Sequence, residues 1–168
     1  MKTTKQVEPL KTPQSILILN DIRSIINVGA IFRTADAIGV DQIILAGVSP
    51  APIDRFGRIR ADFAKASLGS EYSVSWEQSE NIIKKIKDLK KQGYTVIAIE
   101  QAPISIHFKK YKLKKNQKIV IIPGNEVDGV PKQILKLSDV ILELPMRGVK
   151  ESLNVSVATG IILYHLLD

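Results

Sequence analysis

Three short polar segments carry side chains whose types and spacing could support chemistry, and the first is residues 27–33. Gly29 and Arg33 are four residues apart and fall on one face of a predicted helix. Helical side chains lean towards the N-terminus, so the Arg33 guanidinium is expected to extend over bare Gly29 towards Asn27, forming a small polar pocket. The alternative is an ordinary N-cap, a helix glycine and a solvated arginine. A helix-interior glycine costs about 1 kcal/mol relative to alanine, which favours a specific role for Gly29.

The second polar segment follows the apolar run at residues 119–122. Its loop holds two glycines, Gly124 and Gly129, and the carboxylate of Glu126. If the run is a strand of a parallel sheet, this loop lies at the carboxyl edge, where open α/β sheets bind ligands. The alternative is an ordinary turn with a solvated acid.

The third segment, residues 144–164, joins the end of a strand to a polar loop and then to an apolar helix. Ser152 is a suitable N-cap, which predicts a helix over residues 153–167. Apolar residues surround most of that helix, so it should be buried. Ser156 and Thr159 share a face with Ser152, and we expect this face to pack against a neighbouring helix or a second subunit.

Several other chemistries are not supported by the sequence. The chain has no cysteine, which excludes disulfides, a thiol nucleophile and thiolate metal sites. Its two histidines, His107 and His165, do not support a histidine-rich metal centre, and we expect no metal. The glycine-rich dinucleotide fingerprint, the phosphate-binding loop and the serine-hydrolase elbow are also missing.

The elements that must position these segments alternate between strands and helices. This alternation predicts an α/β fold with a mainly parallel sheet covered by helices on both faces. Strands are expected at residues 16–19, 42–45, 72–76, 94–99, 118–122 and 140–144. Helices are expected at residues 27–38, 61–67, 79–92, 131–137 and 153–167, with Gly39 closing the first and residues 49–60 irregular.

Length and composition suit one globular domain. Of the 168 residues, 45% are hydrophobic and 24% charged, and we expect a flexible tail at residues 1–14 and a single domain at residues 15–168. No apolar run approaches the roughly 20 residues of a membrane span. The N-terminal residues lack the apolar region of a signal peptide, which predicts a cytoplasmic protein.

The charge of the chain favours polyanionic partners. There are 24 basic and 17 acidic residues, a net charge of +7. Five lysines at residues 109–115, with Phe108 and Tyr111, could contact phosphates and stack on bases. The alternative is a solvated connection. Structural roles are expected for Trp76 and for both histidines.

The three polar segments together resemble a known family. Leu144-Pro-Met-Arg-Gly-Val-Lys-Glu-Ser-Leu-Asn-Val-Ser-Val-Ala is similar to the third motif of the SpoU/TrmH RNA 2'-O-methyltransferases, part of the SPOUT superfamily. Residues 27–33 and 122–129 resemble the other two motifs, and the similarity extends over residues 16–166. The resemblance implies a C-terminal trefoil knot and a homodimer joined near it.

The resemblance also implies S-adenosylmethionine as the cofactor. It would lie bent in the knot, with adenine held largely by backbone groups near Ile99, Gly124, Leu144 and Leu153. The cofactor-binding residues that the resemblance implies are Ile99, Ile122, Gly124, Leu144, Met146, Ser152 and Leu153.

The family's polar active-site positions correspond to Asn27, Arg33, Glu126, Ser152 and Asn154. The reaction requires in-line attack of a ribose 2'-hydroxyl on the sulfonium methyl. A guanidinium, with a pKa above about 12, is a poor base, so we expect Arg33 to orient the hydroxyl or a neighbouring phosphate. Glu126 and Asn154 would hold Arg33 and Asn27 in place.

The resemblance predicts methylation of tRNA or rRNA. RNA capture is expected to use Arg55, Arg58 and Arg60, together with lysine-rich surfaces of both subunits. Two alternatives stay open. The first is a non-catalytic RNA-binding protein of the same fold, and the second is a different α/β enzyme acting on a small nucleotide.

Overall fold

The chain folds around one parallel sheet. A computed structural model describes residues 14–168, and within them seven strands pair in the order β3-β2-β1-β6-β4-β7-β5. The strands are β1 (Ser15–Asn20), β2 (Gln42–Ala46), β3 (Ser75–Ser79), β4 (Thr95–Ile99), β5 (Ile106–His107), β6 (Ile119–Pro123) and β7 (Val140–Glu143). Every pairing between them is parallel.

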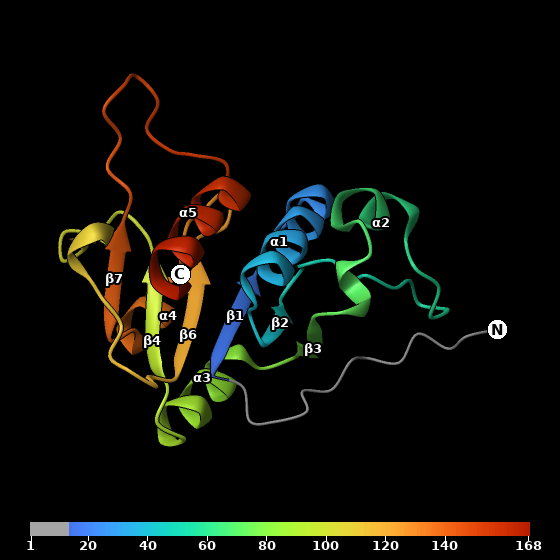
Figure 1. Cartoon of the computed structure of the whole chain (residues 1–168), viewed down its shortest axis with the longest axis horizontal. Coiled ribbons are helices and arrows are strands. Elements are labelled where there is room, and N and C mark those ends of the chain that lie inside the picture. Colours follow the sequence, from blue (N-terminus) through green and yellow to red (C-terminus); the bar gives the residue numbers. More distant parts are fainter. Residues whose placement is uncertain (1–13) are drawn as a thin grey trace.

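Helices cover both faces of the sheet, as predicted. Figure 1 shows α1 and α5 in front of the central strands. The helices are α1 (Ile25–Ile38), α2 (Ala61–Ser67), α3 (Ile82–Lys91), α4 (Lys132–Leu137) and α5 (Val155–Leu167), with 3-10 turns η1 (Ser70–Tyr72) and η2 (Phe108–Lys110). None of these helices is long and apolar enough to cross a membrane, a finding that covers the described residues.

The two faces of each central strand pack into different apolar clusters. On β1, Leu17 and Leu19 join the cluster under α1 and α5, whereas Ile16 and Ile18 join the cluster under α3 and α4. A strand buried on both faces needs an apolar side chain at every position. The continuous apolar runs of the sequence therefore predicted these strands well.

The predicted flexible tail at residues 1–14 lies outside the described residues except for Gln14. The backbone N–H of Ile119 donates to the Gln14 carbonyl at 2.8 Å. The trefoil knot that the family resemblance implies stays a prediction.

Several predicted boundaries were wrong, and local capping explains the helices. Helix α1 begins at Ile25, because Ser24 is the N-cap and its Oγ accepts from the backbone N–H of Asn27 at 3.2 Å. Helix α5 begins at Val155 with Asn154 as its N-cap, so Ser152 lies in the preceding loop. Asn27 was expected to start its helix and instead lies in the first turn of α1, whereas Asn154 was expected inside its helix and is instead the N-cap of α5.

Other differences concern short elements. Helix α3 begins after Asn81, which is its N-cap, and not at residue 79. Strand β3 spans residues 75–79 and not 72–76, because Tyr72, where the strand was expected to begin, is the last residue of η1. The two-residue strand β5 was not predicted, since two residues carry no periodicity. Gly39 closes α1 in the left-handed conformation, as predicted.

The aromatic residues of the lysine-rich connection belong to the core. Phe108 and Tyr111 are half-buried and pack against the apolar cluster beneath α5. The Phe108 ring meets the His165 ring edge-on with centroids 5.1 Å apart, and His165 Nε2 lies 2.9 Å from the Tyr111 carbonyl. The two aromatic rings therefore fit a structural connection better than they fit a surface on which bases stack.

The prediction that Arg33 covers the bare surface of Gly29 was wrong. Gly29 is buried because α2 packs directly on it. A Cβ added at Gly29 would lie 2.7 Å from the Ala66 Cβ and 3.1 Å from the Phe63 carbonyl. The glycine is thus needed for the close approach of two helices, and Arg33 is exposed.

This contact yields a stability prediction. Gly29→Ala should destabilise the fold by about 1–3 kcal/mol, because overpacking outweighs the helix-propensity gain of about 1 kcal/mol. The measurement is the free energy of urea-induced unfolding. The double variant Gly29→Ala/Ala66→Gly should lose less stability than the sum of the losses of the two single variants, because removing the Ala66 methyl group relieves the overlap. A Gly29→Ala protein more stable than the wild type would contradict the packing account.

Candidate active site

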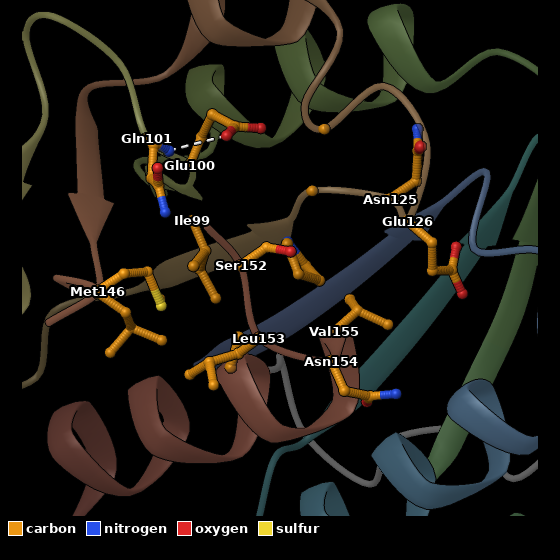
Figure 2. Close-up of a pocket in the computed structure, with 15 residues that line it drawn as sticks. Ile99, Glu100, Gln101, Asn125, Glu126, Met146, Ser152, Leu153, Asn154 and Val155 are labelled. Atoms are coloured by element: carbon orange, nitrogen blue, oxygen red, sulfur yellow. Dashed lines mark hydrogen bonds between the residues drawn. The ribbon is translucent and has the colours of Figure 1, made fainter. Parts of the chain in front are cut away.

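A cavity of about 370 Å³ lies at the carboxyl ends of β4, β6 and β7. Parallel strands place these ends at the same edge of the sheet, so loops far apart in sequence meet there. Figure 2 shows their side chains arranged around the cavity. The lining residues are Ile99, Glu100, Gln101, Pro123, Gly124, Asn125, Glu126, Gly129, Leu144, Met146, Ser152, Leu153, Asn154, Val155 and Ala158.

The cavity brings together most of the residues that the resemblance assigned to cofactor binding. Six of them line it, namely Ile99, Gly124, Leu144, Met146, Ser152 and Leu153. Ile122 does not line it, because its side chain is buried in the apolar cluster on the α3 and α4 face. The next residue, Pro123, lines the cavity instead, as the alternation of a strand requires.

The walls of the cavity combine apolar surface with negative charge. Ile99, Leu144 and Leu153 offer surfaces on which a flat apolar group could pack. Glu100 and Glu126 contribute carboxylates, and no lysine or arginine is among the lining residues. This set of groups fits a ligand that joins an aromatic base to a positively charged centre. Within residues 14–168, no three His, Asp or Glu side chains are grouped as a metal site needs.

A chain of hydrogen bonds joins the three polar segments at the rim of the cavity. Asn27 Nδ2 donates to Glu126 Oε1 at 2.9 Å, and Asn154 Nδ2 donates to Asn27 Oδ1 at 3.1 Å. At one end, Asn154 Oδ1 accepts from the backbone N–H and hydroxyl of Ser156, at 2.8 and 2.6 Å. At the other, the backbone N–H of Arg23 donates to Glu126 Oε2 at 3.3 Å. Every amide in the chain therefore has a defined orientation.

The same contacts affect the ionisation of Glu126. Partial burial raises the pKa of its carboxyl, but hydrogen bonds from the Asn27 side chain and from the backbone N–H groups of residues 126, 23 and 24 outweigh it. The net effect is a pKa below the ordinary value of 4.5. Glu126 is consequently a carboxylate at neutral pH, able only to accept hydrogen bonds.

Two predicted catalytic residues stand apart from this hydrogen-bond chain. Ser152 lines the cavity, but Arg33 does not. Arg33 lies six residues after Asn27 on α1, about 9 Å further along the helix axis. In the described part of the chain, no hydrogen bond or ion pair engages its side chain, so Glu126 and Asn154 hold Asn27 and not Arg33.

Two site residues that sequence reasoning missed are Glu100 and Gln101. Glu100 Oε2 accepts from the backbone N–H of Val130 at 2.7 Å, and its Oε1 accepts from the backbone N–H of Gln101 at 2.8 Å, the bond dashed in Figure 2. Gln101 Nε2 donates to the Glu151 carbonyl at 2.9 Å. These residues directly follow a strand at the carboxyl edge, the same signal that drew attention to Glu126.

The Glu100 carboxylate also explains two glycines of the second segment. Gly129 has φ +69°, and a Cβ there would overlap Glu100 Oε2. A Cβ at Gly124 would lie 3.0 Å from that oxygen and 3.0 Å from the Gly129 Cα. The loop after β6 is therefore folded tightly around the Glu100 side chain.

The three arginines predicted to bind RNA lie on the chain between β2 and α2. Arg58 forms an ion pair with Asp54 at 2.9 Å, and Arg60 Nε lies 3.9 Å from Asp62. Arg55 is exposed, with its guanidinium 4.8 Å from the centroid of the Phe56 ring. Part of the positive charge of this segment is thus paired within the chain.

Comparison with known proteins gives the family of this chain. A sequence model described as the SpoU rRNA Methylase family matches residues 14–164. The chain belongs to this family. The three polar segments and all residues that line the cavity lie within the matched region. The candidate site is therefore part of the SpoU domain.

SpoU relatives include RNA methyltransferases of known specificity. A tRNA (guanosine(18)-2'-O)-methyltransferase of Aquifex aeolicus is 30% identical, over 98% of this chain and 74% of the relative. The 23S rRNA (guanosine-2'-O-)-methyltransferase RlmB of Neisseria meningitidis is 31% identical, over 94% of this chain and 59% of the relative. This chain thus spans between about three fifths and three quarters of their lengths.

A solved SpoU-like structure also matches the fold. The AdoMet-bound rRNA methyltransferase from Sinorhizobium meliloti is 26% identical and superposes with a TM-score of 0.81. The match covers 98% of this chain and 59% of that chain. The α/β architecture predicted from the sequence is confirmed.

The bonds of Glu100 yield a prediction. Glu100→Ala should lower the free energy of unfolding by about 1–3 kcal/mol, because the buried N–H of Val130 loses its acceptor. Glu100→Gln keeps an acceptor oxygen and should cost less. Chemical denaturation measures both, and Glu80→Ala, at an exposed position, is the control with an expected effect within about 0.5 kcal/mol. Equal losses at positions 80 and 100 would show that Glu100 does not support the loop.

The lowered pKa of Glu126 yields a pH prediction. A carboxyl with a depressed pKa in the folded state stabilises the fold above its ordinary value of 4.5 and loses that contribution as the pH falls further. The stability difference between wild type and Glu126→Gln should therefore be constant from pH 7 to about 5 and shrink towards pH 3. We expect less than about 1 kcal/mol, since the site is exposed. A difference that grew on acidification would contradict the stated sign.

Proposed function

We propose that this chain transfers a methyl group from S-adenosylmethionine to a ribose 2'-hydroxyl of tRNA or rRNA. The observation that carries the proposal is the Asn154–Asn27–Glu126 chain of hydrogen bonds at the rim of the cavity. It places amide and carboxylate groups where a hydroxyl could be held beside a bound methyl donor. The named activities of the Aquifex and Neisseria relatives support the same reaction.

The cavity residues suit the proposed cofactor. When bound, S-adenosylmethionine supplies an electrophilic methyl group on a positively charged sulfur. Ile99, Leu144 and Leu153 would contact the adenine, and the Glu100 and Glu126 carboxylates make the cavity favourable for positive charge. Met146 and Ser152 complete the wall from the loop before α5.

The polar residues would position the hydroxyl. Glu126, ionised at neutral pH, fixes the orientation of the Asn27 amide, and Asn154 fixes its other end. Arg33, exposed on the same helix as Asn27, would orient the 2'-hydroxyl or the adjacent phosphate with its planar fork of donors. Its side chain leans towards the N-terminus of α1, which shortens the distance to Asn27.

The experiment that tests this function maps ribose methylation. Total RNA from cells lacking the protein is incubated with the purified chain and S-adenosylmethionine, and 2'-O-methylated positions are sequenced. New methylation at a defined nucleotide supports the proposal. If no position changes and calorimetry detects no S-adenosylmethionine binding, the alternative of a non-catalytic RNA-binding protein replaces it.

Arg33 gives a sharper form of this test. Arg33→Lys keeps the charge but loses the planar fork, and we expect methyl transfer to slow by about 10- to 100-fold. Cofactor affinity by calorimetry should be unchanged, because Arg33 does not line the cavity. Near-normal turnover of Arg33→Lys would remove the orienting role from this residue.

We also infer a homodimer formed through α5. Val157, Ile161 and Tyr164 repeat at four- and three-residue spacing on this helix, and each is between 39% and 50% exposed. Leu153, in the loop before α5 at the rim of the cavity, is a further apolar residue that is 43% exposed. An exposed apolar stripe of this kind is typical of an interface between subunits.

The predicted small-residue face has a different role from this stripe. Thr159 is fully buried, and a Cβ at Gly160 would lie 3.5 Å from Thr34 of α1. That side of α5 packs against the neighbouring helix, one of the two predicted possibilities. The proposed second subunit would cover the opposite, exposed residues.

A charge substitution tests the dimer. Ile161→Glu should shift the protein from dimer to monomer in sedimentation velocity, because a carboxylate would be buried in an apolar interface. Ile104→Glu, at a residue 77% exposed in the loop after β4, is the matched control and should stay dimeric. A wild-type protein that sediments as a monomer at micromolar concentration would end the proposal.

The proposal also covers the RNA-binding residues and the cellular location of the protein. Arg55, Arg58 and Arg60 would contribute contacts to the RNA from the segment between β2 and α2. A tRNA or rRNA substrate is consistent with action in the cytoplasm.

A further inference from the structure

The chain between β2 and α2 holds an aromatic ring out in solvent. Phe56 is 65% exposed, at the tip of a turn closed by a bridge between Ile53 and Ile59. In Figure 1 this part of the chain swings out beyond α2, at the end of the molecule away from β7. Burial of this ring by a partner would remove apolar surface from water and would therefore be favourable.

The turn is fixed by one carboxylate. Asp54 Oδ1 accepts from the backbone N–H groups of Phe56 and Arg58 at 2.8 and 3.0 Å. Asp54 Oδ2 accepts from Arg58 Nε at 2.9 Å, and Gly57 adopts φ +75° at the tip. The conformation that presents Phe56 is therefore set before any partner binds, which lowers the entropic cost of binding.

Two guanidinium groups lie against the exposed ring. The Arg55 and Arg58 Cζ atoms are 4.8 and 5.1 Å from the Phe56 centroid, within the range of a cation–π contact. The tip thus combines three planar groups, one aromatic and two cationic. Aromatic rings and guanidinium planes are the groups on which unpaired bases stack, and the charges favour the adjoining phosphates.

An open hollow of about 660 Å³ adjoins the ring. Phe56 and Arg60 line it together with Gln78, at the end of β3. An amide side chain can both donate to and accept from the edge of a base. The hollow opens at the carboxyl edge of the sheet, the edge that also carries the cavity and Glu126. Two strand spacings, about 10 Å, separate β2 from β6.

We propose that the Phe56 turn is a binding site for an unpaired nucleobase of the RNA, which stacks on the Phe56 ring while Arg55 and Arg60 contact its phosphates. The inference rests on the proposed function, because it places a nucleotide near the one that is methylated. It adds a substrate class: the RNA must offer a single-stranded base close to its target ribose. A fully paired helix has no base free to stack there.

A protein partner is the competing occupant of this surface. The segment carries three arginines within six residues against Asp54, and Arg55 has no carboxylate partner among the described residues. A polyanion matches this charge better than an average protein surface does. Phe108 and Tyr111, the other aromatic residues that lie among basic residues, pack on the core, whereas Phe56 does not. Among these rings, Phe56 is therefore the one available to stack on a base of a polyanion.

The test compares RNA probes that differ only in their bases. Binding of a ten-residue oligoadenylate and of an abasic oligonucleotide of equal length and charge is measured by fluorescence anisotropy. The wild type should bind oligoadenylate about tenfold more tightly than the abasic probe. Phe56→Leu should abolish this ratio without altering the salt dependence of binding, because it removes a ring and no charge.

Two further variants control for folding and position. Phe56→Trp keeps an aromatic face and should retain the ratio. Tyr72→Leu removes a ring of similar exposure, 57%, from η1 and should also retain it. The proposal is overturned if Phe56→Leu keeps the wild-type ratio, or if Phe56→Trp loses it while its unfolding midpoint is unchanged. Equal affinity of the wild type for both probes also overturns it, and leaves the surface to a protein partner.

The outcome is separable from that of the proposed function. Methyl transfer by the wild type to total RNA, with no preference for oligoadenylate, would uphold the enzyme and reject the Phe56 site. A base-dependent affinity that Phe56→Leu abolishes, without any methyl transfer, would uphold the site and reject the enzyme.

Discussion

The hydrogen bonds from Asn154 to Asn27 and from Asn27 to Glu126 are the constraint on which the site depends. They join residues 127 and 99 positions apart, from the start of α5, the first turn of α1 and the loop after β6. The parallel sheet brings these three segments to one edge, because it aligns the carboxyl ends of β1, β6 and β7. The fold and the chemistry of the site are therefore linked through two amides and one carboxylate.

The cavity beside this network is formed by loops that side-chain hydrogen bonds hold in place. Glu100 fills the space that side chains at Gly124 and Gly129 would occupy, and Gln101 ties the end of β4 to the loop before α5. The hydrogen bonds of these two side chains hold loops that a bound cofactor would contact. A site built in this way leaves few conspicuous side chains in the sequence, which explains why composition and spacing pointed to RNA methylation only through the family motifs.

Sequence reasoning succeeded where one physical rule decided the outcome. The strands buried on both faces are continuous apolar runs, and Gly39 ends α1 because its left-handed conformation suits glycine. It failed where a contact between residues far apart in the sequence determines the role of a residue. Gly29 is explained by Ala66 of α2, and the pairing of Asn27 with Glu126 needs the tertiary structure. The starts of α1 and α5 were within reach, since Ser24 and Asn154 are favoured N-cap residues.

A crystal structure of the chain with S-adenosylmethionine tests the central claim most directly. The account predicts density for the adenine between Ile99, Leu144 and Leu153, with the methyl group directed towards the rim where Asn27 meets Glu126. Density for the ligand in another hollow, such as that beside Phe56, would contradict it. So would a ligand in the cavity whose methyl group points away from the Asn27 amide.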